Sequence, residues 1–159
     1  MDDTTLEELD HESHVRRAVD LAREAGERGD GPYGSVLVRD GEVVAESSNR
    51  ERSRDDIALH PELSLARRAA REAAPDERAR TVMYTSTEPC SMCATGIAFA
   101  GLGAVVYSVS GARAAELRGR QPRGIPSEEV FDRWNAEVAV RGPVLPAAGE
   151  AVHEEYREE

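Results

Sequence analysis

The sequence predicts an α/β fold, a three-layer α/β/α sandwich built around a five-stranded mixed sheet. Two runs of β-branched residues flank an Asp-Gly pair, which is typical of a β-hairpin and predicts one antiparallel pair of strands. Later apolar runs alternate with segments of helical periodicity, and strands joined through helices lie parallel in one sheet. The 159 residues contain no internal repeat and no shift in composition, so we expect a single domain over residues 1–159.

The first half of the chain is expected to contain a helix, the hairpin and a second helix. Residues 11–28 place apolar side chains at helical spacing. Residues 34–47 form the predicted hairpin, with Asp40-Gly41 as its turn. An alanine- and leucine-rich run after His60 predicts a helix that ends before the next proline.

The second half alternates short strands with helices. The predicted elements are, in order, a strand at 80–86, a helix at 90–100 closed by Gly101, a strand at 103–109, a helix at 127–135, a strand at 136–142 and a helix at 149–158. We expect the Ser127 side chain to cap the helix that begins there. Residues 1–12 are expected to form a flexible tail, and residues 143–159 to form a segment that covers the functional site.

The composition is acidic, with a formal net charge of −11, and the 20 basic residues are all arginine. Two explanations of the missing lysine stay open, adaptation to high intracellular salt and a GC-rich genome. The charge argues against broad attraction to nucleic-acid phosphates. No apolar run is long enough to span a membrane, and the first residues are acidic rather than basic as in a signal peptide. We therefore expect a cytoplasmic protein without a membrane partner.

Cys90 and Cys93 are the only cysteines, and they lie one helical turn apart after a proline. At the start of a helix both side chains can face one point, and the helix N-terminus favours their thiolate forms. A thiol redox pair is the alternative interpretation. His60 opens another helix and is the natural third metal ligand if the two helix N-termini converge. A Cys₂His set leaves a fourth tetrahedral position open, which is typical of catalytic zinc.

Glu62 follows His60 by two residues and is placed to accept a proton beside this metal. The combined pattern, His-x-Glu followed by Pro-Cys-x-x-Cys, is the signature of zinc nucleobase deaminases. Over residues 15–109 the sequence resembles the cytidine deaminase-like superfamily, and within it the branch of guanine, cytosine and tRNA-adenosine deaminases.

This resemblance implies a fold, a reaction and a set of site residues. It implies the cytidine deaminase-like fold and a Zn²⁺ ion bound by His60, Cys90 and Cys93. In the implied reaction a zinc-activated water attacks the ring carbon that bears the exocyclic amine, and Glu62 carries protons to a ring nitrogen and to the departing ammonia. Asn49 matches the asparagine that holds the base in these enzymes, and its alternative interpretation is a turn residue.

Four more residues are candidates for substrate binding. Tyr33 follows Gly-Pro in a loop that resembles the one in guanine deaminases. Phe99 lies where those enzymes place a pocket aromatic, and Gln121 lies near the place of an acidic residue that reads the base. Tyr156 is the candidate in the C-terminal segment. The structural alternatives are packing beneath the loop for Tyr33, a core position for Phe99 and a solvated helix face for Tyr156.

Pro61 stands between the proposed ligand and the proposed proton carrier. At the first turn of a helix a proline breaks no intrahelical hydrogen bond. The deaminases that this sequence resembles usually have alanine or glycine at this position, and their backbone N–H there is expected to help hold the substrate. Pro61 cannot donate, so we expect it to change substrate recognition. The alternative is that it only makes the start of the helix rigid.

Together these observations predict a zinc-dependent hydrolytic deaminase of a free nucleobase or a related aminated heterocycle, of guanine, cytosine or aminotriazine type. The alternatives are a tRNA adenosine (A-to-I) deaminase and a non-catalytic, zinc-stabilised interaction module. The expected partners are a small nucleobase-like substrate and a second copy of the chain, because the family forms dimers through helices beside the sheet and residues 94–103 are moderately apolar. Nucleic acid is not an expected partner.

Overall fold

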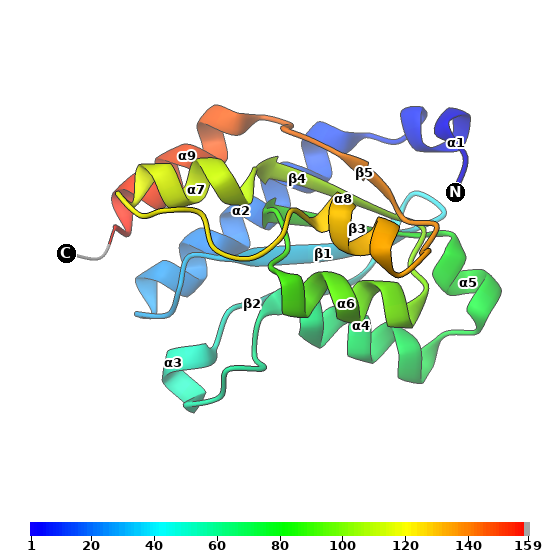
Figure 1. The fold of residues 1–159 in the computed structure, drawn as a ribbon, viewed down its shortest axis with the longest axis horizontal. Coiled ribbons are helices and arrows are strands. Elements are labelled where there is room, and N and C mark those ends of the chain that lie inside the picture. The colour runs from blue at the N-terminus through cyan, green and yellow to red at the C-terminus, as the bar shows by residue number, and fades with distance from the viewer. Residues whose placement is uncertain (158–159) are drawn as a thin grey trace.

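A five-stranded mixed sheet lies at the centre of the molecule, as the sequence predicts (Figure 1). The computed structural model describes residues 1–157. The strands lie in the spatial order β2-β1-β3-β4-β5, and their bounds are β1 Gly34–Arg39, β2 Glu42–Ser48, β3 Thr81–Thr87, β4 Ala104–Val109 and β5 Ala139–Arg141.

Strand β1 is antiparallel to both of its neighbours, whereas β3, β4 and β5 run parallel. The β1–β2 hairpin turns at Asp40, with φ 52°, and Gly41, with φ 82°. Two consecutive positive φ values are the turn geometry that Asp-Gly favours, so this pair of residues sets the hairpin. The parallel strands are joined through helices, which confirms the predicted mixed sheet.

Helices cover both faces of the sheet (Figure 1). Their bounds are α1 Asp3–Glu7, α2 His11–Glu27, α3 Glu51–Arg54, α4 Pro61–Glu72, α5 Pro75–Ala79, α6 Ser91–Ala100, α7 Gly111–Leu117, α8 Ser127–Arg133 and α9 Pro146–Glu155. One apolar core joins the sheet to α1, α2 and α9, and the other joins it to α4, α6 and α8. The three-layer prediction is therefore confirmed.

Strand β1 supplies side chains to both cores. Val36 and Val38 belong to the core beneath α2, and Leu37 belongs to the core beneath α4 and α6. Successive side chains of a strand point to opposite faces, so a strand covered on both sides has a continuous apolar sequence.

Helices α4 and α6 lie side by side on one face and place the functional region (Figure 1). Pro61 is the first residue of α4 and follows His60, where its missing N–H costs no intrahelical hydrogen bond. Helix α6 begins after Cys90, just beyond the end of β3, and ends at Gly101 with φ 71°. The starts of the two helices converge, which brings His60 and Cys90 together.

The N-terminal segment packs against the protein, in contrast to the flexible tail expected from the sequence. Residues 3–7 form α1, and Leu6 has no exposed surface. The Asp2 carboxylate caps this helix by accepting a hydrogen bond from the Thr5 backbone N–H at 2.8 Å. One leucine in a short acidic stretch produces no periodicity, so hydrophobic patterning could not reveal this helix.

Several boundaries in the rest of the chain also differ from the prediction. Ser127 does not cap α8, because it is the first residue of the helix and Pro126 stands at the cap position; its hydroxyl donates a hydrogen bond to Glu88 at 2.8 Å. Strand β5 is shorter than the predicted strand, and α9 begins and ends three residues earlier than predicted, while residue 158 lies outside the described residues. The short helices α3, α5 and α7 were not predicted. Within residues 1–157, none of the helices combines the length and the apolar character that crossing a membrane requires.

Candidate metal centre and active site

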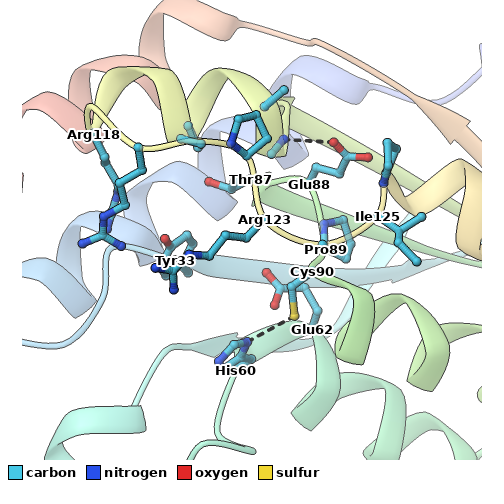
Figure 2. A pocket seen from close by; sticks show the side chains of 18 of the residues that line it. Tyr33, His60, Glu62, Thr87, Glu88, Pro89, Cys90, Arg118, Arg123 and Ile125 are labelled. Atoms are coloured by element: carbon cyan, nitrogen blue, oxygen red, sulfur yellow. Dashed lines mark hydrogen bonds between the residues drawn. The ribbon is translucent and has the colours of Figure 1, made fainter.

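A pocket of 360 Å³ opens where α4 and α6 begin (Figure 2). His60, Glu62 and Cys90 line it on one side, and the start of α7 and the loop of residues 118–126 line it on the other. Tyr33 stands at one end of the pocket. The volume of this pocket lies within the range of small-molecule sites, about 300–1,000 Å³.

His60, Cys90 and Cys93 present three potential metal ligands whose atoms all lie within 4.8 Å of one another. The Nδ1 of His60 is 3.7 Å from the Sγ of Cys90 and 3.6 Å from the Sγ of Cys93. A tetrahedral zinc ion with its usual Zn–S and Zn–N bond lengths separates nitrogen and sulfur ligands by about 3.6 Å. The donor set and its spacing therefore fit zinc with one coordination position left over.

Hydrogen bonds inside this cluster set its charge. The hydrogen bond with Cys93 and then the one with His60 lower the pKa of Cys90 to about 4. The hydrogen bond with Cys90, followed by burial, raises the pKa of Cys93. The hydrogen bond with Cys90 also raises the pKa of His60 to about 9. These shifts pair a Cys90 thiolate with a protonated His60, and a metal ion bound by the three side chains would replace the protons that they share.

Glu51 contacts His60 and lines the pocket, although the sequence does not predict it as a site residue. Its Oε2 lies 3.1 Å from the Nε2 of His60, on the side of the ring away from the cysteines. A carboxylate at this place fixes the ring orientation, as is typical of metal-bound histidines. Glu51 is held in turn by Asn49, whose Oδ1 accepts a hydrogen bond from the Glu51 backbone N–H at 2.9 Å. No periodic or motif signal marks an acidic residue in so short a helix.

Glu62 is a buried carboxylate in the pocket, with only 4% of its surface exposed. Its Oε1 accepts a hydrogen bond from the Thr85 hydroxyl at 2.9 Å and one from the Ser35 hydroxyl at 3.4 Å. Burial is the largest effect on its pKa and raises it. The two hydroxyls hold one oxygen, and the carboxylate faces the same pocket as the His60 and Cys90 side chains (Figure 2).

Four of the six predicted substrate-binding residues line this pocket: Tyr33, Asn49, Pro61 and Gln121. The other two do not. Phe99 is 69% exposed and packs edge-on against Trp134, with ring centroids 5.0 Å apart, because it lies on the face of α6 opposite to the buried one. It is neither a pocket residue nor a core residue in this chain.

Tyr156 lies away from the pocket, against helix α2. Its ring occupies the space where a Cβ of Gly26 would be, with the Tyr156 Cγ 2.6 Å from that position. The C-terminal segment approaches the pocket instead through His153, which contacts Thr87 and Arg118 from behind the pocket wall. The expected cover by Tyr156 is therefore wrong.

The loop of residues 118–126 forms a pocket wall from which Gln121 was predicted and the other residues were not, and Glu88 anchors the helices on either side of this loop. The Glu88 carboxylate accepts hydrogen bonds from the Gly111 N–H at 2.9 Å and from the Ser127 N–H at 2.9 Å. These contacts tie the starts of α7 and α8 to the segment between β3 and α6. Arg118, Arg120 and Arg123 place cationic side chains along this wall.

Comparisons with known proteins bear directly on this arrangement. A family model described as the cytidine and deoxycytidylate deaminase zinc-binding region matches residues 9–109. Guanine deaminase of Bacillus subtilis (strain 168) is 37% identical over 109 residues, which are 68% of this chain and 70% of that protein. A tRNA-specific adenosine deaminase of Agrobacterium fabrum is 41% identical over 86 residues, which are 54% of this chain and 57% of that protein.

The fold has solved counterparts as well. A guanine deaminase from Nitrosomonas europaea superimposes with a TM-score of 0.74 at 22% identity, covering 91% of this chain and 83% of that one. The family match spans well over half of the chain and contains the histidine, the glutamate and both cysteines of the site. The chain therefore belongs to the cytidine and deoxycytidylate deaminase zinc-binding family, and its homologues are deaminases that hydrolyse C–N bonds.

Proposed function

We propose that this protein is a zinc-dependent hydrolytic deaminase of a small aminated heterocycle, a free nucleobase or a related compound of guanine, cytosine or aminotriazine type. The observation that carries the proposal is the position of Glu62. It is a buried carboxylate that opens into the same pocket as the His60, Cys90 and Cys93 cluster. A purely structural metal site has no use for such a carboxylate beside an open coordination position.

In the proposed reaction, each residue has a defined task. When bound by His60, Cys90 and Cys93, zinc supplies a Lewis acid that makes a water molecule more acidic. Glu62 takes a proton from this water, delivers it to a ring nitrogen, and assists departure of the amine as ammonia. The carbon–oxygen bond that forms replaces the carbon–nitrogen bond that breaks. Thr85 keeps the carboxylate in place throughout.

The small-substrate proposal has support from charge and from the pocket wall. The net charge of −11 opposes the approach of a polyanion. Tyr33, Asn49 and Pro61 give the pocket an aromatic ring, an amide and an apolar surface. These are suitable walls for a flat ring with a few polar edges. Guanine deaminase activity of a relative points in the same direction.

A tRNA adenosine deaminase is the second candidate, and one observation favours it. Arg118, Arg120 and Arg123 line the pocket in a protein that is otherwise strongly acidic. Arginines beside a base pocket suit the phosphates that flank a flipped nucleotide. The relative from Agrobacterium fabrum acts on tRNA by name. We rank this candidate second because the surrounding charge disfavours a polyanion.

An ammonia-release screen of the zinc-loaded protein tests the proposal. It should include guanine, cytosine, an aminotriazine and a tRNA with adenosine at the anticodon wobble position. Release from at least one small compound supports the main proposal, whereas inosine formation in tRNA alone reverses the ranking. A chain that binds zinc but releases no ammonia from any of these would point to the non-catalytic module, and a redox-active chain without zinc would point to a thiol oxidoreductase.

We also propose that the protein is a cytoplasmic homodimer. The exposed apolar side chains Phe99 and Trp134 contact each other on α6 and beyond the end of α8, on the side of the molecule where residues 94–103 lie. Light scattering at low and high salt tests the dimer, because salt screens the repulsion between two acidic chains. A monomer at both salt concentrations would contradict it.

A further inference from the structure

Helix α9 places the buried side chain of His153 behind the pocket. This side chain is 2% exposed, and its two ring nitrogens contact two pocket-lining residues. Its Nε2 lies 2.8 Å from the Thr87 Oγ1, and its Nδ1 lies 3.3 Å from an Arg118 Nη2. The His153 ring also packs edge-on against Tyr33, with centroids 5.8 Å apart. Three wall residues therefore share one buried partner that does not itself line the pocket.

The contact with Arg118 decides which nitrogen of His153 carries the proton. A guanidinium group only donates hydrogen bonds, so the Nδ1 of His153 must accept. The Arg118 Nε–H also points at this atom, at 3.4 Å. Burial, aided by Arg118, lowers the pKa of His153 to about 4, so the ring is neutral at neutral pH. Its one proton is therefore on Nε2 and is donated to the Thr87 hydroxyl.

This arrangement leaves the hydrogen of the Thr87 hydroxyl for the pocket. Within residues 1–157, the Thr87 Oγ1 has His153 as its hydrogen-bond partner and no other. Thr87 lies at the end of β3, and its side chain is part of the pocket wall, across the pocket from His60 (Figure 2). Because the oxygen accepts from His153, the hydroxyl faces the pocket as a donor. Pro61, in the same pocket, has no backbone N–H to offer.

We propose that Thr87 is a substrate-binding residue, held as a hydrogen-bond donor by the relay Arg118–His153–Thr87. The protein then selects aminated heterocycles that present a carbonyl oxygen to this wall as the hydrogen-bond acceptor. Arg118 and His153 act as positioning residues that set the direction of the Thr87 hydroxyl. The choice of ligand rests on the proposed deaminase function, whereas the relay stands on its own contacts.

Two pairs of compounds test the substrate preference. In each of two pairs, cytosine with 2,4-diaminopyrimidine and guanine with 2,6-diaminopurine, the second compound has an amine in place of the carbonyl and has lost the proton of the neighbouring ring nitrogen. We expect the protein to bind the carbonyl member of at least one pair more tightly in calorimetric titrations. Thr87→Val, which keeps the shape but removes the hydroxyl, should reduce this ratio about threefold to tenfold. Thr87→Ser should retain it, and so should Thr95→Val, a matched control on α6 beside Trp134.

His153→Phe separates a positioning role from a structural one. Like Thr87→Val, this substitution should reduce the affinity for the carbonyl compound relative to the diamino compound of a pair. If His153 has a purely structural role, the substitution should instead weaken the binding of both compounds equally. Nitrogen-15 NMR of the histidine rings tests the relay directly. We expect His153 with Nδ1 unprotonated and Nε2 protonated, and we expect Arg118→Met to abolish this preference.

Each outcome decides one claim. A protonated Nδ1 on His153 overturns the relay, and an unchanged ratio in Thr87→Val overturns the substrate role. Absence of binding by all four compounds also counts against the role of Thr87. If the ratios shift as expected but no compound releases ammonia, the proposed deaminase function fails and this inference stands. If ammonia is released while the binding ratios do not shift, the proposed deaminase function stands and the role of Thr87 fails.

Discussion

The Nδ1 of His60 lies 3.6 Å from the Sγ of Cys93, although 33 residues separate them in the chain. Helices α4 and α6 produce this approach, because each begins at the same end of the sheet and each places a ligand in its first turn or just before it. The distance matches that between two ligands of one tetrahedral zinc ion, about 3.6 Å. The metal centre is thus a consequence of how two helices pack.

Cys93→Ala should lose zinc and stability together. The Cys93 sulfur is one of the three proposed protein ligands, and metal binding in such a site is coupled to folding. Elemental analysis should fall from about one zinc per chain to a small fraction of it, with a lower melting temperature. Met92→Ala is the matched control, because Met92 is the preceding residue of α6 and is 38% exposed. A Cys93→Ala protein with full zinc would disprove the ligand assignment.

Glu51→Ala should weaken zinc binding without removing a ligand. The Glu51 carboxylate lies 3.1 Å from the Nε2 of His60 and orients the ring. Loss of such an outer partner typically costs about 10–100-fold in metal affinity or activity. Chelator competition measures the zinc dissociation constant, with Arg54→Ala on the same short helix as the control. Equal constants for Glu51→Ala and wild type would mean that this contact has no role in the site.

The stability of the protein should depend on pH through His153. Burial lowers the pKa of His153 from its ordinary 6.5 to about 4 in the folded protein, so between these values the unfolded chain binds more protons. The stabilisation is therefore complete above pH 6.5 and is lost as the pH falls toward 4. From pH 7 to pH 5 this amounts to about 2 kcal/mol. Denaturant unfolding of wild type and His153→Phe at both pH values measures it, and equal pH dependence in the two proteins would refute this role.

Pro61→Ala restores a backbone donor in the pocket at the start of α4. If the missing N–H shapes recognition, the preference among substrates should shift about threefold to tenfold toward those with an acceptor there. If the proline only makes the start of the helix rigid, the ratio of kcat/KM values for two bases stays constant, and the free energy of unfolding falls by less than about 1 kcal/mol. Relative kcat/KM on two bases and thermal melting distinguish the two explanations.

Much of the fold could be predicted because it rests on local patterns. Asp40-Gly41 marks the hairpin, and the apolar run of β3 marks a strand buried on both faces. The site residues His60, Glu62, Cys90 and Cys93 could be predicted because the motif carries its own spacing. They are brought together by the structure, as the motif requires.

The other pocket residues could not be predicted, because they depend on long-range packing. His153 meets Thr87 across 66 residues, and no local pattern encodes that contact. Tyr156 was predicted in its place, one helical turn further along, where the chain has already passed the pocket and packs on Gly26. Phe99 was assigned to the pocket by resemblance, although the helical repeat turns it toward solvent.

The central claim is that Glu62 carries protons in a hydrolytic deamination, and Glu62→Gln tests it most directly. Glutamine keeps the shape of the side chain and its contact with Thr85, so zinc content and melting should stay close to wild type. Ammonia release from the best small substrate should fall by at least about 10²–10⁴-fold, because one group serves several proton transfers. A Glu62→Gln protein that keeps its zinc and turns over near the wild-type rate would contradict the mechanism.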